Sequence, residues 1–432
     1  MSADVTRRRF TQALLASSLA VAVGKVAAQA AARNPITEFG AVADGKTVNT
    51  KAIQSAIDQL AAQGGGTVVV PAGRFVSGAL FFKPQVHLHF EPGAVLECST
   101  DMANFPGRRT RIEGHFEENF TPALINAKGC HGLRITGEGT LDGAGRPIWD
   151  LFWKLRNAAK DPHNFPNLGL PRARLALLEE SRDVLVEGLT FKDSQFWNLH
   201  IYNCQDVTVR KARFLVPDDY KQAPSTDGID LDSCQRVTVE SCYFSVTDDC
   251  IAAKGSKGPL ALEDRSSPPV EHIRVRNCVF KRGHSVLTLG SEATIVRDVV
   301  IEDCEVGDVR VAHLKLRADT PQHYEDIHYR NIKLSGKSAS IVDIIPWSQY
   351  KNLQGHKPPQ STVRNISFTG FSGTAGTLGN IEPNPGQTTI SDIVLKNFNV
   401  QLAEGQLRAV GASNLQLENV VVNGKRYTST AS

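Results

Sequence analysis

Two adjacent aspartates, Asp248 and Asp249, stand in the segment "SVTDDCIAAKGS" at residues 245–256, where a turn-like stretch gives way to an apolar one. Neighbouring carboxylates repel each other when both are ionised, so the pKa of at least one of them should rise. Cleavage of a glycosidic bond needs one protonated and one ionised carboxyl group. The first donates a proton to the leaving oxygen, and the second activates water or attacks the sugar. The pair is therefore a candidate for holding a proton on one of its two members.

Four further segments align with this one when the chain is read as a series of similar strands. They are "FWNLHIYNC" (196–204), "TDGIDLDSC" (226–234), "GHSVLTLGS" (283–291) and "HLKLRAD" (313–319). The alignment gives Asp227, Asp249 and His284 one shared position and puts Asp248 one residue earlier. If the strands stack about 4.8 Å apart, these side chains form a column of three carboxylates and an imidazole. Asp230 and Asp232 alternate along their strand, so we expect them to face solvent.

Cations are expected beside this column. In "HLKLRAD", Leu314 and Leu316 have one parity while Lys315 and Arg317 have the other. If the leucines face the core, both cations point outward next to the carboxylates. Lys254 ends the neighbouring strand. Two or three fixed cations would suit the carboxylate of a sugar acid, although a salt-bridged surface is the alternative.

The element that must align these residues is a repeated strand. Apolar and polar residues alternate with period two in units that start every 22 to 39 residues from residue 184 onward. Examples are "VTVRKARF" (207–214), "VTVESCYF" (237–244), "IRVRNCVF" (273–280) and "IVLKNFNV" (393–400). Such a period indicates a solenoid, and no unit holds a stretch long enough for a crossover helix. We therefore expect an all-β fold, a parallel β-helix in which each strand pairs with its equivalent one turn away.

The cysteines and one N-terminal segment fit this architecture. Cys242, Cys278 and Cys304 share a repeat position that other units fill with apolar residues, so we expect buried free thiols rather than disulfides. Residues 49–65 have helical apolar spacing, and a short helix there would cap the open end of the solenoid. The chain holds no CxxC pair and no HExxH spacing, so we expect no metal and no cofactor.

The first thirty residues are typical of an export signal. "TRRRF" at 6–10 precedes the apolar run "ALLASSLAVAVG" at 13–24, and the arginines resemble a twin-arginine signal. An ordinary secretory signal is the alternative, and the run is too short for a membrane anchor. We predict an export signal over 1–30, a single catalytic domain over 31–432, and a bacterial periplasmic or secreted location.

The net positive charge of the chain comes from this leader. It carries four basic residues and one acidic residue, which leaves 48 − 4 = 44 basic and 45 − 1 = 44 acidic side chains in the remainder. A formally neutral chain gives no sign of a nucleic-acid partner. We expect a monomer.

The four motifs taken in order resemble glycoside hydrolase family 28, the polygalacturonase family. "STDGIDLDSC" resembles its Asn-Thr-Asp motif, "DDCIAAKGS" its Asp-Asp motif, "RGHSVLTLGSE" its Gly-His-Gly motif and "HLKLRAD" its Arg-Ile-Lys motif. The likeness extends over nearly the whole chain after the leader, beginning with "FGAVADGKTVNTKAIQSAID". It implies a right-handed parallel β-helix and metal-free hydrolysis with inversion at the anomeric carbon.

The resemblance also implies a role for each matching residue. Asp248 would be the general acid, and Asp227 and Asp249 would hold and activate the water. His284 would lie near the acid and tune it or contact the substrate. Lys315 and Arg317 would bind the carboxylate of the substrate.

Three departures put the sugar in question rather than the reaction. Ser225 stands where the family has Asn, Ser285 replaces the second Gly, and Lys315 and Arg317 are exchanged relative to Arg-Ile-Lys. The segment 109–125 looks like an insertion of exo-acting bacterial relatives that could close one end of a groove.

We therefore expect a hydrolase that acts on galacturonic-acid-containing pectic saccharides from their ends. The alternatives are a rhamnogalacturonan hydrolase or α-L-rhamnosidase, a pectate-lyase-like enzyme, and a non-catalytic carbohydrate-binding solenoid.

Overall fold

The computed structural model describes residues 32–428, which belong to one compact unit. The expected export signal over 1–30 lies outside the described residues. Within them, no helix is both long enough and apolar enough to cross a membrane.

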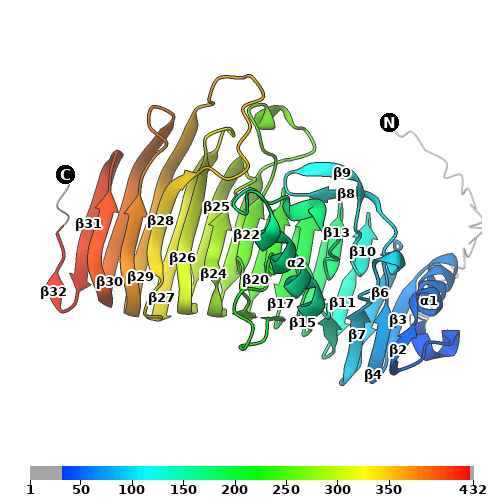
Figure 1. Ribbon diagram of the computed structural model, residues 1–432. Helices are drawn as coiled ribbons and strands as arrows, with labels where there is room; N and C mark the ends of the chain where they lie inside the picture. The colour runs from blue at the N-terminus through cyan, green and yellow to red at the C-terminus, as the bar shows by residue number, and fades with distance from the viewer. Residues whose placement is uncertain (1–31, 429–432) are drawn as a thin grey trace, which may run out of the picture. The chain divides into compact units, whose positions relative to one another are not determined.

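The described chain winds into a parallel β-helix with three strand faces, which confirms the fold expected from the repeats (Figure 1). Face A carries β5 (Leu80–Phe82), β10 (Ile125–Lys128), β13 (Ala176–Glu179), β16 (Leu199–Tyr202), β19 (Ile229–Asp232), β22 (Ile251–Lys254), the later parts of β24 (Val279–Leu289) and β26 (Glu305–Arg317), and β28 (Ser340–Trp347).

Face B follows face A along each turn of the helix. Its strands are β1 (Arg33–Pro35), β3 (Gly66–Val70), β6 (Val86–Phe90), β11 (Arg134–Gly137), β14 (Arg182–Glu187), β17 (Gln205–Arg210), β20 (Gln235–Glu240), β23 (Val270–Arg276), β25 (Ile295–Glu302), β27 (His323–Ser335) and β31 (Ala412–Val422). Face C then completes the turn. It holds β2 (Asp44–Val48), β4 (Gly73–Ser77), β7 (Ala94–Cys98), β12 (Thr140–Asp142), β15 (Thr190–Lys192), β18 (Arg213–Leu215), β21 (Tyr243–Ser245) and the first parts of β24 and β26. The long strands β29 (Ser361–Ile381) and β30 (Thr388–Ala409) run across the faces at the C-terminal end, where β32 (Lys425–Arg426) pairs antiparallel with β31.

Period-two alternation gives each strand one buried side, and equivalent residues stack from coil to coil. On face B, Val207 pairs with Val237, which pairs with Ile273 in the next coil, and all three are buried. The turn from face B to face C needs a left-handed residue, which Ser241 (φ 54°) and Asn277 (φ 54°) supply in successive coils.

The core repeats in the same way. Phe191, Phe214, Phe244 and Phe280 stack along face C with ring centroids 4.9 Å apart at each step. All eight cysteines are free and buried, so the expectation of packed thiols is confirmed.

Three elements stand outside the coil. Helix α1 (Thr50–Ala62) lies at the N-terminal end of the solenoid and buries Ile53, Ala56, Ile57 and Leu60, which follow helical spacing (Figure 1). Helix α2 (Arg146–Ala158) and the antiparallel hairpin of β8 (Arg108–Ile112) and β9 (His115–Phe120) are inserted between strands of faces C and A. Both insertions lead into face A.

Candidate active site

The predicted carboxylates meet at the N-terminal ends of the face A strands. Ile229 of β19 pairs with Ile251 of β22, and Ile251 pairs with Leu287 of β24. Two residues before each of these stand Asp227, Asp249 and Ser285, which therefore share a register. His284 is one residue earlier and lies beside Asp248, whose carbonyl accepts a hydrogen bond from the His284 amide.

The expectation that His284 aligns with Asp227 and Asp249 is therefore wrong by one residue. The three carboxylates and the imidazole do come together, but in two adjacent rows. Asp227, Asp249 and Ser285 form one row, while Asp248 and His284 belong to the other. Because side chains alternate along a strand, the offset places His284 against Asp248 and leaves Ser285 to contact Asp249.

Asp248 is held by donors on three sides. Its carboxylate accepts hydrogen bonds from the Ser225 amide at 3.2 Å and the Asp249 amide at 2.9 Å, and it lies 3.1 Å from Nδ1 of His284. Burial would raise the pKa of Asp248, but the charge and hydrogen bond of His284 outweigh it and lower that pKa. In turn, the charge of Asp248 raises the pKa of His284 to about 9. The side chain of Asp248 is 26% exposed, so it is accessible to a ligand.

Asp249 is buried and ionised. Oδ1 accepts a hydrogen bond from the Ser285 hydroxyl at 3.1 Å, and Oδ2 accepts one from Nζ of Lys315 at 3.2 Å. Burial opposes ionisation, yet the Lys315 ammonium and the neighbouring histidines hold the pKa of this carboxyl well below its usual range. Lys315 also lies over the ring of Trp347, with Nζ 4.7 Å from the centroid. Lys315 therefore lies beside the carboxylates, as expected.

The pKa of Asp227 is shifted in the opposite direction to the pKa values of Asp248 and Asp249. It is 3% exposed, and burial followed by the charge of Asp248 raises its pKa well above the usual value. Lys254 lies 3.7 Å from Asp227 and 3.6 Å from Asp230, and its Nζ is 4.7 Å from the ring centroid of Trp197. The rise in pKa expected for one carboxyl therefore falls on Asp227 rather than on the adjacent pair.

Asp230 and Asp232 do not face solvent, which corrects the sequence expectation. Both are fully buried. Burial raises the pKa of Asp230 to about 8. Asp232 accepts a hydrogen bond from Nε of Arg111 at 3.0 Å, where Arg111 belongs to the β8–β9 hairpin. The hairpin therefore reaches across face A to the C-terminal end of β19.

Arg317 also departs from expectation. It is 1% exposed and forms a two-pronged ion pair with Asp319, at 2.8 and 2.7 Å, instead of lying against the acidic column. Its remaining donors bind the carbonyls of Gln349 and Tyr350. Arg317 thus anchors residues 347–352, which we call the strap.

The strap crosses to the other side of the site. Gln349 donates to the His163 carbonyl at 2.5 Å, and the Tyr350 hydroxyl donates to the Phe165 carbonyl at 2.8 Å. Asp319 accepts a hydrogen bond from the Asn352 amide at 2.6 Å, which fixes the near end of the strap. These bonds join the loop after β28 to the loop after α2.

The space between these elements, which we call the catalytic cavity, has a volume of about 110 Å³. Besides the predicted residues it is lined by groups that the sequence analysis did not name: Glu113, Asn167, Trp197, Ser291, Glu292, Trp347, Gln349 and Tyr350. Burial and the charge of Glu292 raise the pKa of Glu113. Glu292 directly follows the "LTLGS" of an aligned segment, whereas Glu113 is brought in by the hairpin turn.

A second cavity of about 240 Å³ adjoins the first at the N-terminal ends of the strands. Asn167, Ser225 and Asp248 line both cavities. The second cavity, which we call the α2 cavity, adds Phe152, Trp153 and Arg156 from α2, together with His284. Asp248 therefore stands at the boundary between two spaces that could each hold part of a saccharide.

Asp248, Asp249 and His284 are also residue types that can bind a metal ion. One ligand atom each from Asp248, Asp249 and His284 lie within 4.8 Å of one another. However, His284 and Lys315 already supply cations to these carboxylates. Lys254 adds a third positive charge nearby. The arrangement fits carboxyl chemistry better than the binding of a further cation.

Comparison with known proteins identifies the family of the chain. The model of the glycosyl hydrolases family 28 matches residues 67–423. A probable polygalacturonase of Vitis vinifera is 30% identical over 283 residues, which cover 62% of this chain and about half (53%) of the grape protein. An exopolygalacturonase of Zea mays is 25% identical over 79% of this chain and 77% of its own length. The fold resembles the crystal structure of an exopolygalacturonase from Thermotoga maritima, with a TM-score of 0.72, 23% identity, and 92% and 93% of the two chains covered.

Proposed function

The chain belongs to the glycosyl hydrolases family 28 and is a glycoside hydrolase, and on this premise we propose that it hydrolyses galacturonic-acid-containing pectic saccharides from their ends, with inversion. The observation that carries the proposal is the meeting of Asp227, Asp248 and Asp249 at one edge of β19 and β22, with a cavity on each side of Asp248. Such a set of carboxyl groups is what glycosidic hydrolysis by acid and base requires.

We assign the acid to Asp248. It is the most exposed of the three carboxyls and lies where the two cavities meet, so a glycosidic oxygen that bridges them would reach it. Asp248 and Nδ1 of His284 lie 3.1 Å apart, and the raised pKa of His284 means that the pair would carry one proton at neutral pH. Asp248 would give this proton to the leaving oxygen as the bond to the anomeric carbon breaks.

Asp249 is the better base because Lys315 keeps it ionised. It would take a proton from a water molecule, whose oxygen then attacks the anomeric carbon from the face opposite the leaving group. Asp227, whose raised pKa favours the protonated form, would orient this water. The three carboxyls thus receive different tasks from different surroundings.

Cleavage from chain ends is supported by the hairpin and the strap. Glu113 at the hairpin tip and Tyr350 of the strap both line the catalytic cavity, so a long polymer could not lie freely along face A. The maize relative carries the name exopolygalacturonase. Exo action is therefore our proposal for this chain.

A rhamnogalacturonan-directed hydrolase is the second candidate. Lys315 and Arg317 are both engaged with carboxylates of the protein, at 3.2 Å and 2.7 Å, so neither is a free cation for a galacturonate carboxylate. This weakens the argument from the Arg-Ile-Lys position and keeps the sugar open to test.

The test of the acid is Asp248→Asn, which preserves the shape of the side chain. We expect turnover of oligogalacturonates to fall about 10²- to 10⁴-fold while binding persists, because general acid catalysis contributes that much. Asp183→Asn, at a 72% exposed aspartate on face B, serves as the control. An Asp248→Asn enzyme that keeps full activity would contradict the assignment.

The test of the reaction and the sugar is product analysis on oligogalacturonates and rhamnogalacturonan fragments. Hydrolysis yields new reducing ends without the ultraviolet-absorbing double bond that a lyase creates. Inversion is seen in the anomer first released, by proton NMR. Preferential release of galacturonate units from one end supports the first candidate, whereas cleavage confined to rhamnose-containing fragments supports the second.

Export is part of the same proposal. The arginine-rich leader would carry an already folded monomer across a bacterial membrane to the periplasm or beyond. The eight buried thiols are compatible with folding in a reducing cytosol before export.

A further inference from the structure

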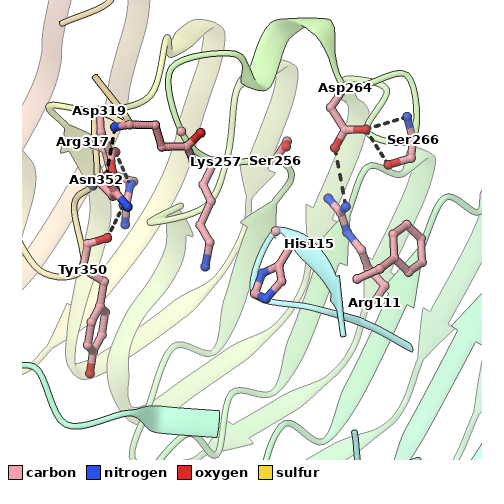
Figure 2. Close-up of a pocket in the computed structure, with 14 residues that line it drawn as sticks. Arg111, His115, Ser256, Lys257, Asp264, Ser266, Arg317, Asp319, Tyr350 and Asn352 are labelled. Carbon is pink, nitrogen blue, oxygen red and sulfur yellow. Dashed lines mark hydrogen bonds and ion pairs between the residues drawn. The ribbon is translucent and has the colours of Figure 1, made fainter. Parts of the chain in front are cut away.

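A third cavity lies at the opposite ends of the same strands, and Figure 2 shows the side chains that line it. Its volume is about 590 Å³. The hairpin contributes Arg111 and His115, the loop after β22 contributes Lys257 and Asp264, and the strap contributes Tyr350. We call it the Lys257 cavity.

Most charges in this cavity are already paired. On one side, Arg317 is bound to Asp319 at 2.7 Å. On the other, Arg111 is bound to Asp232 at 3.0 Å and lies 3.7 Å from Asp264. These pairs leave little net charge on either wall of the cavity.

Lys257 is different. Among residues 32–428, no carboxylate lies within 4.0 Å of its Nζ, and no hydrogen bond holds it. In Figure 2 its side chain extends between the Arg317–Asp319 pair and the Arg111–Asp264 pair. The residue is half-buried, and a cation in a site partly shielded from water interacts more strongly with an anion than a fully exposed lysine would.

The Lys257 cavity adjoins the catalytic cavity. Tyr350 lines both, and Arg317 in its wall lies 3.9 Å from Glu292, which lines the catalytic cavity. After Lys254, the charge of Lys257 also helps to lower the pKa of Glu292. A sugar in the catalytic cavity could therefore be continued by a sugar in the Lys257 cavity.

The three cavities follow the direction of the strands. The α2 cavity includes Thr247 and Asp248, which precede β22, and the Lys257 cavity includes Ser256 and Lys257, which follow it. A saccharide that fills all three would run along the direction of the face A strands. The hairpin is placed to impose this path, because Arg111 ties it down at the end of β19.

We propose that the Lys257 cavity is a binding site for a second acidic sugar, whose carboxylate is bound by Lys257 and which is linked to the sugar in the catalytic cavity. Ser256, Asn352 and Tyr350 line the same cavity and would add further contacts to this sugar. This inference rests on the proposed hydrolysis of acidic saccharides. It assigns to Lys257 the recognition that Arg317 cannot provide.

The experiment compares Lys257→Met with the charge-retaining Lys257→Arg on digalacturonate and trigalacturonate. A dimer spans the bond-cleaving boundary and needs only two cavities, whereas a trimer also needs the third. We expect Lys257→Met to lower kcat/KM for the trimer about 10- to 100-fold, as expected for a lost charged hydrogen bond, and to leave the dimer unchanged. Lys257→Arg should retain most of the trimer activity. Lys211→Met, at a 70% exposed lysine on the turn after β17, is the control.

A direct binding measurement separates recognition from turnover. In the Asp248→Asn background, Lys257→Met should weaken the calorimetric Kd of trigalacturonate by a similar factor, and esterification of the trimer's carboxylates should have the same effect without the mutation. Equal losses on dimer and trimer, or no loss on either, would overturn the assignment of Lys257. A wild-type enzyme that cleaves no oligogalacturonate would instead overturn the proposed function, and this inference with it.

Discussion

At the scale of single residues, the most consequential feature is the 3.1 Å contact between Asp248 and Nδ1 of His284. His284 is 61% exposed, and its pKa is raised to about 9 by the Asp248 charge. The pair is therefore protonated once over the neutral range, on the imidazole in the resting state. Asp249 keeps its negative charge into the acidic range because Lys315 lowers its pKa.

These directions predict the pH profile of kcat/KM. As pH rises through about 9, the Asp248–His284 pair loses its proton, and activity should fall. As pH falls, the rate should decline only below the usual carboxylate range, where Asp249 becomes protonated. His284→Gln removes the imidazolium, so the pKa of Asp248 should rise and the alkaline limb should move to lower pH. The profile is measured on trigalacturonate, and an unchanged alkaline limb in the variant would contradict the shared proton.

The pKa shifts of His284 and Asp249 also make the free energy of unfolding depend on pH. A group whose pKa is raised on folding, as for His284, stabilises the native state below its unfolded pKa, and this contribution is lost as pH rises through about 9. The lowered pKa of Asp249 acts in reverse, because its contribution is present above the unfolded pKa and lost on acidification.

Much of the site could be predicted because Asp248 and Asp249 are adjacent and repeat spacing brings Asp227 to them. The register of His284 could not. "KGS" and "LGS" look equivalent, yet Ile251 pairs with Leu287, so the two segments are offset by one residue. Arg317 has the expected outward parity, but its partners Asp319 and the strap come from turns whose course no strand pattern specifies.

At the scale of elements, the β8–β9 hairpin is the part that turns an open strand face into a cavity. Its tip packs tightly, because a Cβ on Gly114 would lie 2.8 Å from the Gly255 carbonyl and 2.9 Å from Cβ of Glu292. The sequence indicated an insertion at 109–125. Where this insertion packs on face A, however, depends on buried ion pairs such as Arg111–Asp232. Those pairs join residues 121 positions apart, beyond the reach of local patterns.

Gly114→Ala tests the role of the hairpin. Gly114 has φ 77° and Gly132 has φ 73°, but nothing lies within 4 Å of a Cβ added at Gly132. The two substitutions therefore carry similar backbone strain, and only the first displaces the hairpin tip. We expect Gly114→Ala to give a larger loss of polygalacturonate viscosity per bond cleaved, which reports internal cleavage, while Gly132→Ala behaves like the wild type. Equal behaviour of the two variants would show that the tip does not restrict access.

At the scale of the whole described chain, stability comes from repetition without covalent links. The phenylalanine stack and the column of cysteines run through successive coils, and all eight thiols are buried. Burial raises the pKa of Cys204 to about 12, and the neighbouring Cys242 thiol together with burial raises that of Cys278 to about 12, so these thiols are unreactive in the folded protein. The stacked core was predictable from the sequence, because each repeat places a buried residue at the same position.

The thiols give a prediction for the folded protein. A thiol reagent should label almost none of the cysteines in the native enzyme. All eight should become reactive once the protein is unfolded in guanidinium. The melting temperature should be the same with and without a reductant. A fall in melting temperature on reduction would reveal a disulfide and contradict the packing described above.

The pairing of Ile229, Ile251 and Leu287 has a consequence for how enzymes of this architecture can evolve. The backbone ladder fixes the reactive groups independently of the turns, so the turns can lengthen, shrink or be exchanged with little disturbance to the chemistry below them. Grafting the hairpin or the strap onto another solenoid of this kind is thus a practical way to alter what that enzyme accepts.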